Sequence, residues 1–502
     1  MEKKIVIIGA GIAGLSAGCY ARMNGYEAEL YEAHSSPGGL CTSWKKGEFT
    51  IDGCLHWLTG SGEADPFYQL WKELGAVQNR RMYDHEEFYR IADADGKTFI
   101  MYCDADKLER HMKELSPDDK EPIEFLCNLI RKFAGFKAPI DKALELLSFA
   151  ENIKLLWNTK QYMRDLYFFC RISIEEFAQR FKDPFLREVF PMVIDMKEMS
   201  LFGLVLTMSQ LHNKAGGFPI GGSLEFSKAI ETRLLNLGGK INYGKRVEKI
   251  LVKDNKACGI RLENGEDIAA DYVISGADLH HTVYNMLDGK YVEPKHEKLF
   301  QTGLLYHSMV QISFGVNMDL SHEPDCVTEV FKMESPITIG NQQTEWFTMS
   351  NYSFDPTLAP EGKTVLACAF ATDDFEYWES LYADKAAYKA EKERILRITI
   401  AELEKKYPGF ADKIEVSDVL SPMTYKRYAN NYKGSYMSWI MTPELMKNSR
   451  IFKKTLPKLD NFWLTGMWLM PPGGVPAGAR TSRDVMQFIC KQDKKKFVTT
   501  EL

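Results

Sequence analysis

Three glycines near the amino terminus constrain the fold more than any other feature of the sequence. Gly9, Gly11 and Gly14 fit the pattern G-x-G-x-x-G and follow a short apolar run at residues 5–8. Such a run is typical of a parallel strand buried on both faces, and residues 13–24 have helical spacing of apolar side chains. The first glycine permits a tight turn, the second lets the backbone approach a pyrophosphate, and the third lets the helix pack closely on the strand. The segment therefore predicts a strand, a phosphate-binding turn and a helix.

An acid follows at the end of the next expected strand. Residues 27–32 alternate between polar and apolar, which predicts a second strand, and Glu32 stands 18 positions after Gly14. A carboxylate here accepts hydrogen bonds from the adenosine ribose hydroxyls and repels a 2′-phosphate, which argues against NADP. The helix N-terminus offers free N–H groups to the phosphates, but FAD and NAD carry the same ADP half and are not separated by this unit. We expect nucleotide contacts here at Gly9, Ala10, Gly11, Ala13, Gly14, Glu32 and Ala33.

Composition and cysteine spacing exclude several classes of protein. The 502-residue chain has a net charge of −6, so nothing indicates nucleic-acid binding. Its ten cysteines are scattered singly, without a C-x-x-C pair or a zinc or haem pattern. Adjacent histidines such as His280 and His281 point apart, so we expect no metal site. Reduced thiols in a cytoplasmic protein are the simplest interpretation, and we expect neither a leader peptide nor a membrane span.

Residues 105–212 are predicted to be helical. They have long apolar-periodic runs, few turn signals and many aromatic side chains. We interpret them as a helical insert whose aromatic residues pack in the core, cap an apolar pocket or face a membrane, and the sequence leaves these alternatives open. Further on, residues 289–454 alternate strand-like runs with one strong helix at about 384–406, which predicts a mixed α+β domain.

Motifs beyond the first unit carry a family resemblance. Residues 36–42, Ser-Pro-Gly-Gly-Leu-Cys-Thr, resemble the Gly-Gly segment of flavoprotein oxidases and desaturases. Gly47, Phe49, Asp52 and Gly53 then match the continuation in phytoene desaturases, retinol saturases and carotenoid isomerases. Many relatives have arginine directly after the Gly pair, whereas this chain has Leu40, so a flavin contact from that arginine is missing or supplied elsewhere. The resemblance implies non-covalently bound FAD, with contacts at Gly38, Gly39 and Leu40.

The resemblance continues to the end of the chain. Residues 216–223 are similar to a G-G-x-x-P-x-G-G segment that lies near the flavin and substrate in the family, and residues 275–278 to a segment that returns to the cofactor. Residues 464–466 and 471–479 resemble the C-terminal segment whose strand end and helix N-terminus contact the flavin. The resemblance therefore implies further FAD contacts at Val247, Gly276, Gly466, Gly474, Val475 and Pro476.

The same resemblance implies a fold and a domain order. We expect an α/β fold with a Rossmann-like FAD-binding domain of the glutathione-reductase type (a ββα sandwich), a mixed α+β substrate domain and a helical insert. The FAD-binding domain is expected to be discontinuous, over residues 1–104, 213–288 and 455–492. The helical insert or cap would cover residues 105–212, and the substrate-binding domain residues 289–454.

The implied activity is that of an FAD-dependent oxidoreductase. It would desaturate or saturate carbon–carbon bonds of an apolar, isoprenoid- or lipid-like small molecule by hydride transfer with flavin N5. Three alternatives stay open: a flavin-dependent lipid or polyene isomerase without net redox change, an amine-oxidase-type flavoenzyme, and a non-catalytic FAD-containing lipid-binding protein.

Electron partner and catalytic residues are less constrained. The sequence shows no separate G-x-G-x-x-G for NAD(P)H, so the electron partner is expected to be a quinone, oxygen or another protein. Peripheral membrane contact is compatible with the aromatic insert. The one catalytic candidate is His56, because its region often approaches the flavin or the substrate channel in the family.

Overall fold

The computed structural model describes residues 2–447 and 453–501. A five-stranded parallel sheet has the strand order β19-β13-β1-β2-β9. Its strands are β1 (Lys4–Ile8), β2 (Glu27–Tyr31), β9 (Lys240–Asn242), β13 (Tyr272–Ser275) and β19 (Phe462–Leu464). The expected first strand and second strand are confirmed, and β1 is central because it is apolar on both faces.

Alternate residues of β1 pack into different layers. Ile5 and Ile7 belong to a core shared with three helices, α1 (Ile12–Met23), α9 (Gly222–Asn236) and α15 (Gly474–Gln492). Val6 and Ile8 face the other side, where a three-stranded antiparallel sheet shares their core. That sheet consists of β10 (Val247–Lys253), β11 (Lys256–Leu262) and β12 (Asp267–Ala269). This sheet–sheet–helix arrangement is the expected Rossmann-like FAD-binding domain.

A second, seven-stranded mixed sheet has the order β18-β14-β17-β16-β15-β6-β7. Two helices, α11 (Phe375–Ala383) and α12 (Lys385–Lys406), share a buried core with it. Its strands are β6 (Glu87–Ala92), β7 (Thr98–Tyr102), β14 (Ser308–Val316), β15 (Cys326–Ile339), β16 (Gln342–Asn351), β17 (Thr364–Thr372) and β18 (Ile414–Leu420). The sheet thus joins strands from both halves of the chain.

Two strands of this sheet correct an expected domain boundary. β6 and β7 fall within residues 1–104, which were assigned to the FAD-binding domain. β6 instead pairs in parallel with β15, from Cys326↔Glu87 to Phe331↔Ala92. The assignment failed because alternation along a strand predicts its buried face but not its partner sheet.

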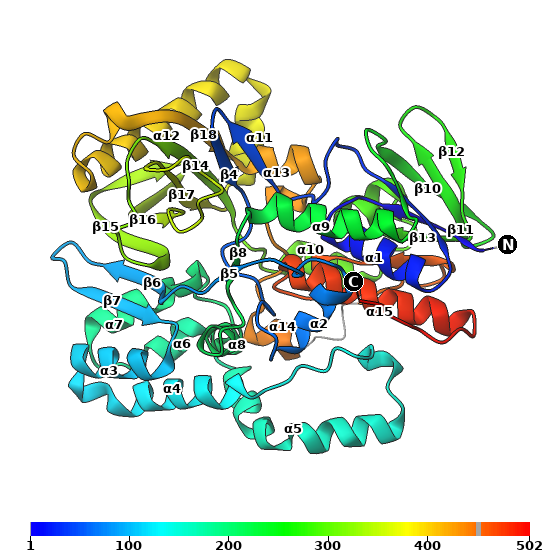
Figure 1. Ribbon diagram of the computed structural model, residues 1–502, viewed down its shortest axis with the longest axis horizontal. Coiled ribbons are helices and arrows are strands. Elements are labelled where there is room, and N and C mark those ends of the chain that lie inside the picture. Colours follow the sequence, from blue (N-terminus) through cyan, green and yellow to red (C-terminus); the bar gives the residue numbers. More distant parts are fainter. Residues whose placement is uncertain (1, 448–452, 502) are drawn as a thin grey trace.

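From Ala105 to His212 the described elements are helices. They are α3 (Ala105–Leu115), α4 (Lys120–Ala134), α5 (Phe149–Phe169), α6 (Ile174–Ala178), α7 (Pro184–Val189) and α8 (Leu201–His212), with short 3-10 turns between them. Their buried side chains form one core with β6, β7 and β15. Most of this helical region therefore packs on the second sheet, whereas α5 runs along the outer edge of the molecule (Figure 1).

The remaining elements connect these layers. They are β3 (Ser43–Lys46), β4 (Phe49–Asp52), β5 (Met82–Tyr83), β8 (Phe218–Pro219), α2 (Pro66–Glu73), α10 (Pro294–Thr302), α13 (Pro422–Ala429) and α14 (Pro443–Lys447). Residues 448–452, which belong to the expected substrate-binding domain, lie outside the described residues. Within the described ranges, no helix is both long and apolar enough to cross a membrane.

Candidate functional site

The turn between β1 and α1 has a backbone that only glycines accommodate. Gly9 has a φ of 91°, in the left-handed region that favours glycine. A Cβ on Gly14 would lie 1.9 Å from the carbonyl oxygen of Gly9, so no side chain fits there. α1 begins after Gly11 without a side-chain cap or an acid in its first turn. Its first N–H groups are therefore open to a phosphate.

Glu32 reaches back across this turn. Its Oε2 accepts a hydrogen bond from the Ala10 N–H at 2.7 Å, and its Oε1 accepts one from the His34 N–H at 2.8 Å. The Glu32 side chain is buried with 8% of the residue exposed. Because a carboxylate offers about four acceptor positions, two backbone donors leave capacity for ribose hydroxyls. Ala33, partly exposed, follows directly at the strand end.

The Gly-Gly segment closes on the same turn. The Gly38 N–H donates to the Ala10 carbonyl at 2.9 Å, and Gly38 and Gly39 have φ values of 105° and 61°. A Cβ on Gly11 would have atoms of Gly38 as its nearest neighbours, at 3.8 Å, so bare backbone lines both sides of this passage. Leu40, in place of the family's arginine, is partly exposed beside the exposed Gly39.

Glycines that follow β13 and β19 form the next part of the candidate site. The Gly276 N–H donates to the Ile8 carbonyl at 3.0 Å, and a Cβ on Gly276 would lie 3.2 Å from the Gly14 nitrogen. Gly466 has a φ of 114°. A Cβ on Gly466 would have the Ala13 Cβ as its nearest neighbour, at 3.8 Å. The two expected contacts at strand ends therefore lie against the start of α1.

The last helix points its N-terminus into this region. α15 begins at Gly474, and Pro476 is accommodated in its first turn. A Cβ on Gly478 would lie 3.3 Å from the Ala13 nitrogen. Gly474, Val475 and Pro476 are thus the first three residues of a helix packed on α1, with the positive end of its dipole near the site.

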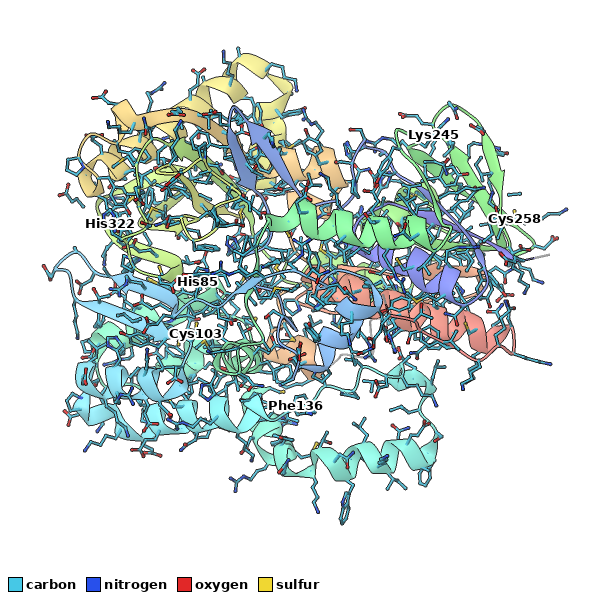
Figure 2. The ribbon with its side chains drawn as sticks, in the orientation of Figure 1. His85, Cys103, Phe136, Lys245, Cys258 and His322 are labelled. Carbon is cyan, nitrogen blue, oxygen red and sulfur yellow. The ribbon has the colours of Figure 1, made fainter. Side chains whose placement is uncertain are left out.

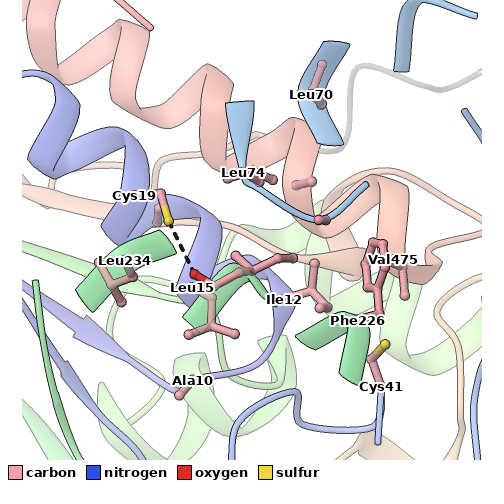
Figure 3. Close-up of a cluster of buried hydrophobic side chains, with 14 of the residues drawn as sticks. Ala10, Ile12, Leu15, Cys19, Cys41, Leu70, Leu74, Phe226, Leu234 and Val475 are labelled. Atoms are coloured by element: carbon pink, nitrogen blue, oxygen red, sulfur yellow. Dashed lines mark hydrogen bonds between the residues drawn. The ribbon is translucent and has the colours of Figure 1, made fainter. Parts of the chain in front are cut away.

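Side chains from the three segments meet behind these turns. Ile12 of α1, Cys41 after the Gly pair and Val475 of α15 belong to one hydrophobic cluster (Figure 3). Val247, at the start of β10, packs in another cluster with Ile8 and Tyr31 at the strand ends. The residues from which nucleotide and flavin contacts are expected therefore lie around the carboxyl end of the parallel sheet, the edge where such sheets bind ligands, and the contacts themselves stay a prediction.

The residues present fit FAD. One helix N-terminus and three side-chain-free glycine positions accommodate a pyrophosphate, and a buried acid stands at the ribose position. A second helix N-terminus from α15 lies beyond them, which a single mononucleotide would not require. His34 is not free for a covalent link to the flavin, because its Nε2 lies 2.8 Å from the Tyr428 carbonyl.

The sequence did not identify two polar clusters that hold the site together. Buried Asp52 accepts hydrogen bonds from the Ser223 N–H at 2.6 Å and the Ser223 hydroxyl at 2.7 Å. Burial raises the pKa of Asp52, and these hydrogen bonds oppose the rise. In α15, the hydroxyls of Thr481 and Ser482 lie 2.9 and 2.7 Å from that of Thr465 on the end of β19. The two consecutive hydroxyl residues of α15 are the signal that could have found this cluster.

His56, the catalytic candidate, lies close to Tyr352. Its Nδ1 is 3.4 Å from the Tyr352 hydroxyl, and its side chain is partly accessible. Burial, together with the nearby His85 that is labelled in Figure 2, lowers the pKa of His56 to about 4. Burial also raises the pKa of Tyr352 well above its ordinary value. Both groups are therefore neutral near pH 7 and able to exchange a hydrogen bond.

The two adjacent histidines have structural neighbours. His280 stacks on Tyr432 with ring centroids 4.3 Å apart, and the His281 N–H donates to Asp278 at 2.7 Å at the start of a short helix. Burial raises the pKa of Asp278 to about 6, although hydrogen bonds from His281 and Tyr432 oppose the rise. Within residues 2–447 and 453–501, no group of three or more His, Cys, Asp or Glu side chains is arranged to hold a metal ion.

Comparison with known proteins identifies the family. The model of the family described as flavin containing amine oxidoreductase matches residues 12–486. The chain belongs to this family. It is an FAD-dependent oxidoreductase, and the match includes the Gly-Gly segment, the second sheet, every strand of the first sheet except β1, and the first two thirds of α15.

Curated relatives are similar over most of the chain. Prolycopene isomerase 2 from an Oncidium hybrid cultivar is 28% identical, covering 87% of this chain and 75% of its own length. Phytoene desaturase (neurosporene-forming) from Rhodobacter capsulatus is 25% identical, and the alignment covers 97% of this chain and 94% of the relative. The similarity to a desaturase therefore runs from end to end in both proteins.

Solved structures share the fold. An oxidoreductase from Methanosarcina mazei aligns with a TM-score of 0.62 at 19% identity, covering 96% of this chain and 100% of that one. A putrescine oxidase variant aligns with a TM-score of 0.63 at 13% identity, and the alignment covers 98% of this chain and 99% of the oxidase chain. At these identities the likeness establishes the shared architecture of both domains.

Proposed function

We propose that this FAD-dependent oxidoreductase desaturates or saturates carbon–carbon bonds of an apolar, isoprenoid-like substrate. The observation that carries the proposal is the similarity to a phytoene desaturase over 97% of this chain and 94% of the relative. Such coverage includes the second sheet and the helical region, where relatives with other substrates would be expected to diverge.

The chain beside the start of α15 suits an apolar substrate. Ser438 donates from its N–H to the Pro472 carbonyl at 3.2 Å, and a Cβ on Gly474 would lie 3.6 Å from the Met437 methyl group. The segment from Tyr436 to Met441, Tyr-Met-Ser-Trp-Ile-Met, has no acidic side chain that would attract an ammonium group. These contacts favour an apolar substrate over an amine.

Bound FAD supplies hydride acceptance or donation at N5. The residues described here would hold it: the α1 turn and Glu32 at the ADP half, and the first turn of α15 at the far end. The free N–H groups of that turn favour negative charge nearby. We include His56 as a pocket residue that exchanges a hydrogen bond with Tyr352 beside the substrate.

Flavin reduction by substrate tests the main proposal. The holoenzyme is mixed anaerobically with acyclic isoprenoid polyenes in detergent micelles, and the visible flavin band is followed together with polyene absorbance. Bleaching of the flavin with lengthening of the polyene chromophore supports desaturation, and reoxidation of reduced enzyme by a polyene supports saturation. Purified protein that shows no flavin band after reconstitution with FAD would contradict the whole assignment.

A second function is favoured by the prolycopene isomerases, which are similar over 87% of this chain. In an isomerase the reduced flavin would act without net redox change. Turnover of a cis-polyene only after prior reduction, with no further reductant consumed per product, would identify this activity. Hydrogen peroxide released with amines would identify an amine oxidase, and flavin that no donor, acceptor or substrate can reduce or reoxidise would identify a lipid-binding remnant.

Electron partner and location form part of the proposal. We propose that a quinone, oxygen or another protein exchanges electrons with the flavin, and rapid-mixing reoxidation with each acceptor ranks them. All ten cysteines are free, which supports a reducing, cytoplasmic compartment. An isoprenoid substrate dissolves in lipid rather than water, so the proposal includes peripheral contact with a membrane.

A further inference from the structure

Exposed apolar side chains are concentrated in one segment. Eleven large hydrophobic side chains are exposed in the described part of the chain, and seven of them lie between residues 144 and 167. The seven are Leu144 (52%), Phe149 (82%), Ile153 (52%), Leu156 (58%), Trp157 (68%), Met163 (46%) and Tyr167 (63%). Scattered exposed hydrophobics are ordinary, but a contiguous set marks a binding surface.

Six of these side chains share one face of α5. At roughly 100° per residue, their positions fall within about a third of the helix circumference. We call this set the outer face of α5; it consists of Phe149, Ile153, Leu156, Trp157, Met163 and Tyr167. α5 forms the lower edge of the molecule (Figure 2), and the six side chains are between 46% and 82% exposed. The outer face therefore does not cover a pocket of its own chain.

The opposite face holds α5 in place. Its two buried residues are Tyr162 and Phe169, whose rings lie 5.0 Å from that of Phe133 on α4. Phe169 also stacks on Phe202 of α8, with centroids 5.7 Å apart. A capping box at Ser148 begins the helix. The outer face is thus presented by a packed and capped helix.

The segment before α5 is fixed to the FAD-binding domain. Arg480 of α15 donates to the carbonyls of Pro139 and Lys142 at 2.9 and 3.1 Å. Arg483 donates to the carbonyls of Ile140 and Asp141 at 3.0 and 2.7 Å. Both arginines are only 6% exposed. The helix that points at the flavin site therefore also anchors the base of α5.

The charge of α5 is complementary to an anionic surface. Lys154, Lys160 and Arg164 are exposed on or beside the outer face, and the Lys160 Nζ lies 3.7 Å from the Trp157 ring centroid. Among the helix acids, Glu151 is paired with Lys142, and Asp165 is paired with Lys132 and, at 3.7 Å, with the 95% exposed Arg164 side chain. The cations accompany apolar side chains, which is the composition of helices that lie in a lipid interface.

We propose that the outer face of α5 inserts into the interface of an anionic lipid bilayer, with the helix parallel to the surface. A second copy of this chain would bring the same cations against each other, whereas lipid phosphates would pair with them. The inference names the contacting element and lipid class for the membrane contact in the proposed function. It does not depend on the carbon–carbon chemistry, because binding is measured without turnover.

Vesicle flotation with the FAD-loaded, full-length protein tests the proposal. Vesicles of phosphatidylcholine alone are compared with vesicles that also contain phosphatidylglycerol. We expect wild-type protein to float with the anionic vesicles. The triple variant Phe149→Ser, Leu156→Ser, Trp157→Ser should bind at least tenfold more weakly, since it removes three exposed apolar side chains of the outer face. The variant Lys154→Gln, Lys160→Gln, Arg164→Gln should lose at least tenfold on anionic vesicles only.

A matched control removes exposed apolar groups elsewhere. Leu235→Ser, Leu304→Ser, Tyr428→Ser changes side chains exposed to 49%, 52% and 47% and should bind as the wild type does. Visible flavin spectra and melting temperatures establish that each variant is folded. Equal binding of wild type and the α5 triple variant, or no binding by the wild type, would overturn the proposal. A vesicle-free dimer that the α5 variant dissociates would assign the face to a second copy instead. Flavin reduction by micellar substrate is measured separately, so failure of the catalytic proposal is distinguishable.

Discussion

The Ser482 hydroxyl donates a hydrogen bond to the Ala13 carbonyl at 2.7 Å, although the two residues are 469 positions apart. Ser482 lies on the last helix and Ala13 in the first turn of the first helix. The same hydroxyl lies 2.7 Å from Thr465 Oγ1 at the end of β19. One buried side chain therefore connects both ends of the chain at the point where the dinucleotide and flavin segments meet.

Replacing Ser482 with alanine tests this connection. We expect Ser482→Ala to lower the free energy of unfolding by about 1 kcal/mol, because a buried hydrogen bond is lost, and to weaken FAD retention. Denaturant unfolding and FAD titration measure the two effects. Ser16→Ala is the control, because the Ser16 hydroxyl is buried in α1 with no hydrogen-bond partner in the described residues. An effect of Ser16→Ala as large as that of Ser482→Ala would contradict the interpretation.

A methyl group at Gly14 should separate α1 from the turn. Its Cβ would lie 1.9 Å from the Gly9 carbonyl oxygen, so the backbone must shift where the pyrophosphate binds. We expect Gly14→Ala to weaken FAD binding at least tenfold, about 1.4 kcal/mol, measured by flavin fluorescence during titration. Gly135→Ala is the control: its Cβ would meet nothing closer than 3.5 Å, and FAD affinity should not change.

Local rules explain why residues 5–32 could be predicted. The apolar run, the glycine spacing and Glu32 each act on near neighbours in sequence, and the structure reproduces the strand, turn, helix and strand. The start of α15 at Gly474 is less evident from local rules, because the prolines and glycines at 471–478 are typical of a turn, although Pro476 is tolerated in a first helical turn.

Long-range partners could not be predicted in the same way. The pairing of β6 with β15 joins residues 87 and 326, and nothing within residues 87–102 selects that partner over the first sheet. The aromatic residues of 105–212 divide between burial and exposure: Phe169 is fully buried, whereas Trp157 is 68% exposed. Helical spacing indicates that a helix has two different faces. Which face of α5 is buried depends on its packing against α4 and α8, which the spacing does not reveal.

Glu32 should contribute to FAD affinity through both of its oxygens. Each oxygen accepts a backbone N–H, from Ala10 at 2.7 Å and from His34 at 2.8 Å. In Glu32→Gln the amide NH2 would face one of these donors, so we expect at least tenfold weaker FAD binding. The comparison is Glu29→Gln, since Glu29 lies on β2, which ends just before Glu32, and forms a partly buried ion pair with Lys4 at 2.7 Å. Equal FAD dissociation constants for the two variants would show that the acid is not part of the site.

The pH dependence of stability should report on His56. Burial lowers the pKa of His56 to about 4 in the folded protein, whereas the unfolded value is about 6.5. Between these values the unfolded state binds more protons, so the free energy of unfolding falls as the pH drops from about 6.5 to about 4. The full effect is at most about 3 kcal/mol below pH 4.

His56→Gln should remove this acid destabilisation while leaving the hydrogen bond to Tyr352 available. We therefore expect the difference in melting temperature between pH 7 and pH 5 to be smaller in His56→Gln than in wild type. His322→Gln is the control, because the His322 side chain is 72% exposed and its removal should leave that difference unchanged. Because the His56 ring is neutral above about pH 5, this group should add no slope to turnover between pH 6 and pH 8. A steep activity change in that range that disappears in His56→Gln would mean that a charged imidazole takes part in the reaction.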